Sequence, residues 1–98
     1  MARRTANRSR KPTRRVAGEF NPSSPWPHVE EFVEYGGNIT IGPIAPIKCA
    51  AVAADNHSML AALVRRDGET FNDLMTRLDH AVNLAINHDA LTDEINPP

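Results

Sequence analysis

The sequence is short of several residue types on which common classes of protein depend. Of its 98 residues, 5% are aromatic and one, Cys49, is a cysteine. A single cysteine excludes an intramolecular disulfide framework and fits a reducing compartment, so we expect a cytoplasmic protein. No apolar run approaches the ~20 residues needed to cross a bilayer, and the N-terminal bases lack the apolar segment of a signal peptide behind them. We therefore expect no membrane partner.

Motifs for catalysis, metal ions and cofactors are also missing. Asp55, His57 and Ser58 supply the side-chain types of a catalytic triad, but polar residues between two apolar runs are typical of a turn. His80 and His88 are about two helical turns apart, and no Cys-x-x-Cys pair anchors zinc. The glycines match neither a phosphate-binding loop nor a dinucleotide-binding turn. We predict a protein that is not an enzyme and that holds no metal ion and no cofactor.

Acidic residues are absent from residues 1–15. The net charge of −1 for the whole chain does not reveal this uneven distribution. The bases of this segment are Arg3, Arg4, Arg8, Arg10, Lys11, Arg14 and Arg15. The remaining chain holds four bases and all 12 acids, so the segment carries +7 and the remainder −8. Charge asymmetry of this size is typical of an interaction tail. The seven bases are our candidate contacts to nucleic acid, because a phosphate backbone releases counterions when cations bind it.

The composition divides the chain into four segments. Residues 1–18, the basic arm, have almost no apolar side chains to offset the ~1–2 kcal/mol per residue that ordering costs, so we expect disorder. Residues 19–27 are a linker rich in proline and serine, whose Phe20 and Trp26 can fold back on the body. Residues 28–88 are the predicted domain, and residues 89–98 are predicted to be a flexible acidic tail.

The apolar spacing in the middle of the chain predicts strands. Ile39 and Ile41 alternate with polar residues and indicate a strand at about 38–42. Two apolar runs of strand length follow, at residues 47–54 and 59–66, and we predict that they pair as a β-hairpin. A helix over the second run, giving a helix-turn-helix outline, stays open because alanine favours helices and a capping serine precedes the run.

Helices are predicted on either side of these strands. The segment 28–35 has helical spacing and stops at Gly36–Gly37, which in the alternative interpretation are the turn of a hairpin. A long amphipathic helix over about 70–88 opens with Thr70 and Asp73, similar to a capping box. Its apolar stripe consists of Phe71, Leu74, Met75, Leu78, Ala81, Val82, Ala85 and Ile86. The predicted fold class is α+β, a small antiparallel sheet or hairpin packed on one long C-terminal helix.

The predicted core is thin, and this leads us to expect a homodimer. A domain of roughly 60 residues buries only about 60% of its unfolded surface and is close to the limit of stability. Leu84 lies outside the apolar stripe of the long helix, beside Arg77 and His88. Together with Phe71 these residues are our candidates for a dimer or partner interface, although Leu84 is equally an ordinary exposed leucine.

One part of the sequence resembles a known group of proteins. Leu63 to Thr70 read L-V-R-R-D-G-E-T, and Arg77 to Ala81 read R-L-D-H-A. These segments resemble uncharacterised small proteobacterial proteins, often near mobile elements, that share L-V-R-R-x-G-E-[ST] followed by R-L-D-x-A. The resemblance implies no activity. A looser resemblance to HicB-type antitoxin domains lies in the strand, the turn ending at Thr70 and the helix after it. The strand-to-loop signature of that family is missing, so this likeness concerns the fold alone.

These observations favour a non-catalytic interaction or regulatory module whose basic arm contacts nucleic acid or an acidic partner. The alternative is a small inhibitor or antitoxin-like protein whose acidic body binds a larger target protein. Charge segregation motivates both hypotheses, because the arm attracts a polyanion while the body attracts a basic surface.

Overall fold

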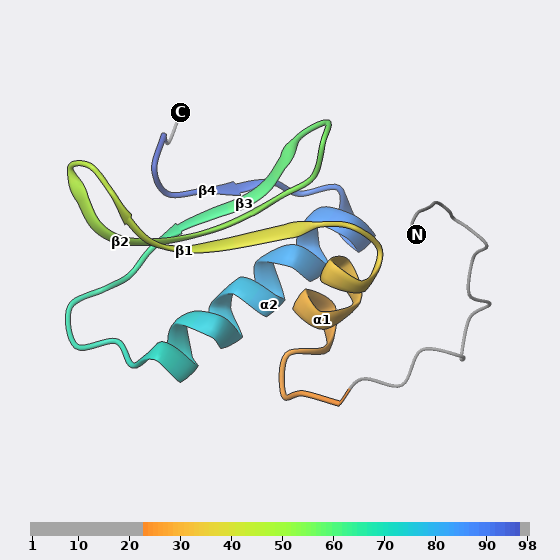
Figure 1. The fold of residues 1–98 in the computed structure, drawn as a ribbon, viewed down its shortest axis with the longest axis horizontal. Coiled ribbons are helices and arrows are strands. Elements are labelled where there is room, and N and C mark those ends of the chain that lie inside the picture. Colours follow the sequence, from red (N-terminus) through yellow and green to blue (C-terminus); the bar gives the residue numbers. More distant parts are fainter. Residues whose placement is uncertain (1–22, 97–98) are drawn as a thin grey trace.

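The computed structural model of the chain describes residues 23–96. In chain order their elements are α1 (Pro27–Glu34), β1 (Asn38–Ile44), β2 (Ile47–Ala54), β3 (Met59–Val64), α2 (Phe71–His88) and β4 (Thr92–Asp93). The sheet forms one layer, and both helices pack against one of its faces (Figure 1). The predicted α+β class, with a long C-terminal helix against a small sheet, is confirmed.

The strands form a sheet in the order β1-β2-β3-β4. The two apolar runs pair as the predicted antiparallel hairpin, with Ala50 opposite Val64, so the competing helix over the second run is excluded. β2 has the predicted bounds, whereas β3 ends at Val64, two residues earlier than predicted. β1 runs two residues longer than predicted and includes Pro43, which an edge strand tolerates because its outward N–H groups need no partner.

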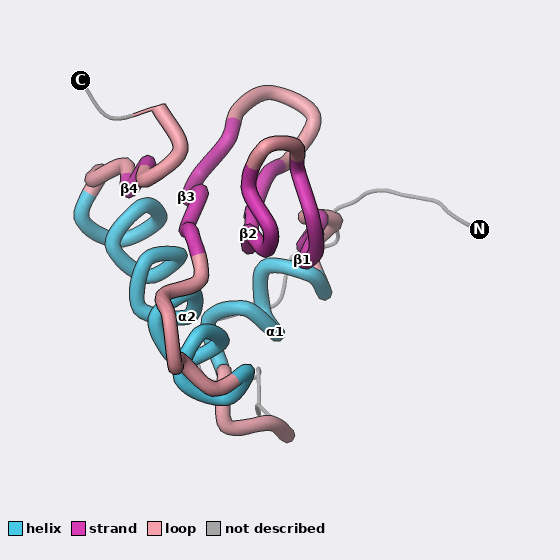
Figure 2. The backbone as a smooth tube through the Cα atoms, turned by 90° about the vertical axis from the view of Figure 1, so that its left-hand side faces the viewer, coloured by secondary structure: helices cyan, strands magenta, loops and turns pink. Residues whose placement is uncertain are grey.

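The C-terminal segment differs from the prediction of a flexible tail over residues 89–98. Thr92–Asp93 form β4, which lies parallel to β3, and the N–H of Glu94 donates to the carbonyl of Ala62 at 2.7 Å. The folded domain therefore extends beyond residue 88 to include this strand (Figure 2). The acidic composition of this segment suggested a solvated tail, whereas the carboxylate of Glu94 in fact accepts a hydrogen bond from Arg77 on α2.

The short first helix is confirmed, and Gly36–Gly37 end it instead of forming a hairpin turn. Pro27 occupies its first position, where a missing N–H is harmless. Val29 and Phe32 are buried, and the Phe32 ring fills the space that a Cβ at residue 37 would need. Trp26 folds back as predicted and meets Phe71 edge to face, with ring centroids 6.3 Å apart. The linker prediction thus needs correction from residue 23 onward, whereas Phe20 and the basic arm lie outside the described residues.

The core lies between α2 and the sheet. Leu74, Leu78 and Val82 of α2 are completely buried, facing alanines of β2 and β3 that are equally inaccessible. Two members of the predicted stripe differ, because Phe71 and Ile86 are 50% and 54% exposed. They stand in the first and last turns of the helix. The cap is confirmed, since Oγ1 of Thr70 accepts the N–H of Asp73 at 3.0 Å.

Candidate functional site

The loop between β3 and α2 brings basic side chains together at one end of the sheet. The N–H of Arg65 donates to the carbonyl of Cys49 at 3.0 Å, which continues the β2–β3 pairing by one step beyond Val64. Continuing the same register places Arg66 opposite Lys48. The chain then turns back through Gly68, whose φ of +76° is a conformation that glycine adopts without strain.

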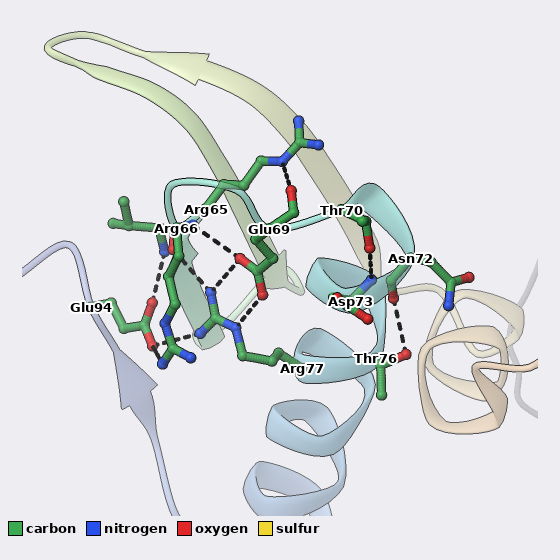
Figure 3. A network of polar contacts seen from close by, with 10 residues as sticks. Arg65, Arg66, Glu69, Thr70, Asn72, Asp73, Thr76, Arg77 and Glu94 are labelled. Atoms are coloured by element: carbon green, nitrogen blue, oxygen red, sulfur yellow. Dashed lines mark hydrogen bonds and ion pairs between the residues drawn. The ribbon is translucent and has the colours of Figure 1, made fainter.

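Arg77 lies behind this loop and joins four elements of the fold (Figure 3). Its Nε and Nη2 donate to the carboxylate of Glu69 at 2.7 and 3.0 Å. Nη1 donates to the carboxylate of Glu94 at 2.8 Å, and Nη2 also donates to the carbonyl of Val64 at 2.9 Å. A guanidinium is suited to this arrangement because its planar donors engage several acceptors at once. The network therefore fixes the loop, β3 and β4 relative to α2.

The two acidic partners of Arg77 differ in how tightly they are held. The Glu69 side chain is only 7% exposed, and its Oε1 also accepts the N–H of Arg66 at 3.0 Å. The hydrogen bond from Arg77, together with the Arg66 N–H, lowers the pKa of Glu69 to about 2. Glu94 is 30% exposed, and its Oε1 accepts the N–H of Val64 at 2.9 Å. Hydrogen bonding to Glu69 in turn raises the pKa of Arg77, so this cation is committed to the fold.

An open cleft of about 760 Å³ lies in front of the same loop, lined by residues 47–49 and 64–70. Lys48, Arg65 and Arg66 lie in its lining and are exposed. The ammonium of Lys48 has no ion pair among the described residues, and Arg65 uses only Nε, which donates to the carbonyl of Glu69 at 3.0 Å. Arg66 stands 3.9 Å from Glu94, with 67% of its side chain exposed. These three side chains keep donors free for an external acceptor.

The cleft is a cationic region on an acidic body. Residues 23–96 contain four bases and eleven acids, a net charge of −7. Three of these bases line the cleft together with Asp67 and Glu69, whereas the rest of the described chain holds one base and nine acids. Because Glu69 is neutralised by Arg77, the uncompensated charge of the lining is positive. The arrangement is suited to holding an anion.

A second polar cluster joins the two helices on the opposite side of α2. Asp79 is buried, and its Oδ1 accepts the N–H groups of His28 and Val29 at 2.7 and 2.9 Å. Its Oδ2 lies 2.8 Å from Nδ1 of His28. The carboxylate thus caps the N-terminus of α1, a task that Trp26 at the cap position cannot perform because it has no acceptor. We assign this cluster a structural role.

The other sequence features examined for chemistry are accounted for by local structure. Oδ1 of Asp55 accepts the N–H groups of His57 and Ser58 at 2.8 and 2.9 Å, which confirms the turn. These two hydrogen bonds lower the pKa of Asp55. Cys49 is half-buried against the core. Within residues 23–96 no three His, Cys, Asp or Glu side chains gather as metal ligands, and no helix there has the length and apolar character of a membrane span.

The structure does not bring the four predicted interface residues to one place. Phe71 stands in the first turn of α2 against Trp26, whereas His88 is the last residue of the helix. Arg77 is turned into its network with Glu69 and Glu94, only 21% exposed. Leu84 is half-buried, and its carbonyl caps the helix end by accepting the N–H of Asp89. An interface through Leu84 and His88 stays a prediction.

The predicted nucleic-acid contacts are the seven bases of residues 1–15, which lie outside the described residues. The sequence did not predict the cleft formed by Lys48, Arg65 and Arg66, nor the network of Arg77. The available signal was the predicted pairing of residues 47–54 with 59–66, which brings Lys48 near Arg65 and Arg66 at one end of the hairpin. Predicting β4 would have been necessary to find Glu94, and nothing in the acidic tail indicated a strand.

A scan of the chain against protein-family models finds no matching family. A search of curated proteins and a search of solved structures likewise find no match.

Proposed function

We propose that the protein is a non-catalytic module that binds nucleic acid through the bases of its N-terminal segment. The observation that carries this proposal is the separation of charge along the chain. All seven bases of residues 1–15 stand without an acid among them, and the described residues that follow carry −7. Double-stranded DNA carries one negative charge per ~1.7 Å of its helix axis, and neutralising these phosphates releases counterions.

The contacts inside the body support this division. Among the described residues, Arg77 is paired with Glu69 and Glu94 at less than 3 Å, so its positive charge is used within the fold. The acids of the body lie mostly on its surface, which therefore repels phosphate over most of its area. Because the body is acidic overall, we expect the N-terminal bases to supply most of the affinity for nucleic acid. Phosphate contacts of this kind position a protein without reading base sequence. The expected binding is therefore tight at low salt and independent of sequence.

Fluorescence anisotropy with a labelled duplex at several salt concentrations tests the proposal. If all seven bases engage phosphates, the slope of log affinity against log salt approaches about −6. A full-length variant with the seven bases changed to glutamine keeps the chain length and should lose most of this slope. A second variant with residues 1–15 in shuffled order keeps the charge and should bind like the wild type. Absence of binding at ~50 mM salt, or equal binding by the glutamine variant, contradicts the proposal.

The proposal includes a homodimer in the cytoplasm. The small core supports self-association, because the buried side chains of β2 and β3 are mainly alanines and Phe71 and Ile86 remain exposed on α2. Light scattering coupled to size-exclusion chromatography measures the mass directly. A mass of one chain across micromolar concentrations contradicts the dimer and leaves the nucleic-acid proposal standing.

A second function is favoured by the charge of the body alone. Among the described residues outside the cleft lining there are nine acids and one base, and all of these acids except Asp79 reach the surface. Such a surface suits an inhibitor or antitoxin-like protein that covers a basic target protein. The glutamine variant separates the two functions in a pull-down. Retention of a stoichiometric protein complex by that variant favours the acidic body, and its loss favours the N-terminal bases.

A further inference from the structure

We infer that the cleft formed by Lys48, Arg65 and Arg66 is a binding site for backbone phosphates of nucleic acid, a second contact beside the N-terminal bases. This inference rests on the proposed function and adds to it a defined site on the folded body. Three of the four bases of residues 23–96 line one cleft, although the surrounding surface is acidic.

The geometry of the hairpin fixes where these cations stand. Lys48 is the second residue of β2, and the bond from the N–H of Arg65 to the carbonyl of Cys49 holds the two segments at strand distance. Neighbouring strands lie about 4.8 Å apart, so Lys48 and Arg66 begin from backbone positions close enough to contact one phosphate group. The cations are thus placed by backbone pairing rather than by their own contacts.

The donors of the cleft remain available because the nearby acids have other partners. Glu69 is directed to Arg77 and to the N–H of Arg66. Glu94 is held by Arg77 at 2.8 Å, whereas its distance to Arg66 is 3.9 Å. Figure 3 shows the guanidinium of Arg65 turned away from the Arg77 network, whereas that of Arg66 lies beside Glu94. Arginine and lysine in this setting are the usual partners of phosphate oxygens.

The cleft also lies close to the first described residues of the chain. Trp26 rests on Phe71, the residue directly after the cleft-lining Thr70. The chain from Arg15 to Trp26 spans at most about 40 Å when fully extended, so its bases and the cleft can engage one stretch of duplex. A backbone of closely spaced phosphates offers partners to both groups of cations at the same time.

The test is a salt titration of duplex binding by a full-length variant, Lys48→Gln with Arg65→Gln and Arg66→Gln. Its matched control carries Asn38→Asp, Asn56→Asp and Asn87→Asp, exposed positions at the other end of the sheet and helix that change the net charge by the same three units. We expect the cleft variant to lower the magnitude of the salt slope by about 2 to 3, since each lost phosphate contact removes about 1. The control should keep the wild-type slope.

The outcomes separate this inference from the proposed function. If the glutamine variant of residues 1–15 loses affinity while the cleft variant matches the control, the inference is wrong and the proposed function stands. If the wild-type protein does not bind duplex at all, both are wrong. An amide chemical-shift titration of the full chain gives an independent readout, in which duplex should shift Lys48 and residues 65–70. Shifts caused by inorganic phosphate but not by duplex overturn the assignment to nucleic acid.

Discussion

Two polar clusters hold α2 in place. They differ in whether charged side chains beside them remain exposed and able to bind a ligand. Asp79 accepts two backbone N–H groups of α1 and faces Nδ1 of His28, so both of its oxygens are used. Arg77 is equally saturated, with two carboxylates and a carbonyl as partners. The loop beside Arg77, however, also carries Arg65 and Arg66, whose guanidiniums are exposed.

The difference teaches that charge alone does not mark a functional residue. Arg77 and Arg66 both approach Glu94, yet one is 21% exposed at 2.8 Å and the other 67% exposed at 3.9 Å. The first is a structural cation, because removing it leaves partly buried carboxylates without a partner. The second retains its hydration and is free to exchange water for a ligand. Substitutions in the two clusters should therefore separate into effects on stability and effects on binding.

The largest expected effect follows from Arg77→Met, which keeps an unbranched apolar stem and removes the charged guanidinium. Glu69, Glu94 and the carbonyl of Val64 all lose their shared donor, and we expect unfolding to become easier by about 3 kcal/mol. Chemical denaturation monitored by circular dichroism measures this loss. Arg77→Lys is the control, and it should recover part of the stability because one ammonium cannot satisfy all three acceptors. Surface ion pairs contribute up to about 1 kcal/mol. A smaller loss than this in Arg77→Met would show that the network stabilises the fold no more than an exposed ion pair does.

Asp79→Ala should have the next largest effect, a loss of about 2 kcal/mol. The substitution removes the carboxylate that accepts the N–H groups of His28 and Val29 at the start of α1. Asp79→Asn retains an oxygen for these groups and should cost less. The matched control is Asp73→Ala, because Asp73 is an exposed aspartate in the first turn of α2, the helix that also carries Asp79. Equal losses from Asp73→Ala and Asp79→Ala would remove the reason for assigning the cap to Asp79.

The contrast between the two clusters also explains which parts of the fold were predictable from the sequence. The helices and strands were predicted from sequence patterns that span only a few residues. The period of α2, the Thr70 cap, the two apolar runs and the turn at Asp55 are each decided by neighbours within a few residues. The structure bears them out, apart from small shifts in strand ends and the exposure of Phe71 and Ile86 in the stripe of α2.

The parts that sequence reasoning missed depend on contacts between distant residues. Glu94 reads as part of a solvated acidic tail until β3 supplies a strand to pair with and Arg77 supplies a counter-charge seventeen residues away. Asp79 reads as a polar residue on an amphipathic helix, because its role depends on α1, some fifty residues earlier. Both are acids in an acidic chain, so composition gave no reason to distinguish them from the surface.

A pH titration sharpens the comparison at Glu69. Its pKa is lowered to about 2 by Arg77 and the Arg66 N–H, whereas an ordinary glutamate titrates near 4.5. The unfolded chain therefore takes up the proton first, so the stabilisation from Glu69 is complete above about pH 4.5 and is lost as the pH falls toward 2. Glu69→Gln should cost about 1 kcal/mol at neutral pH and should make stability fall less steeply in that acid range. Glu31→Gln removes an exposed carboxylate from α1 and is the control. Identical acid profiles for wild type and Glu69→Gln would contradict the role of this carboxylate.

The smallest expected effect on stability belongs to the exposed arginines of the same loop. Arg65→Gln and Arg66→Gln remove one hydrogen bond from Nε to the Glu69 carbonyl and one ion pair of 3.9 Å, both at the surface. Each should change the free energy of unfolding by less than about 0.5 kcal/mol. Exposed ion pairs contribute little because water screens the attraction between the two charges. The backbone N–H of Arg66 still donates to Glu69 in its glutamine variant, so the loop keeps its shape. Thermal unfolding of these two variants and of Arg77→Met under the same conditions measures the difference in stability. A loss for either substitution as large as that of Arg77→Met would mean that these guanidiniums hold the loop, and cations needed for the fold are not free to bind phosphate.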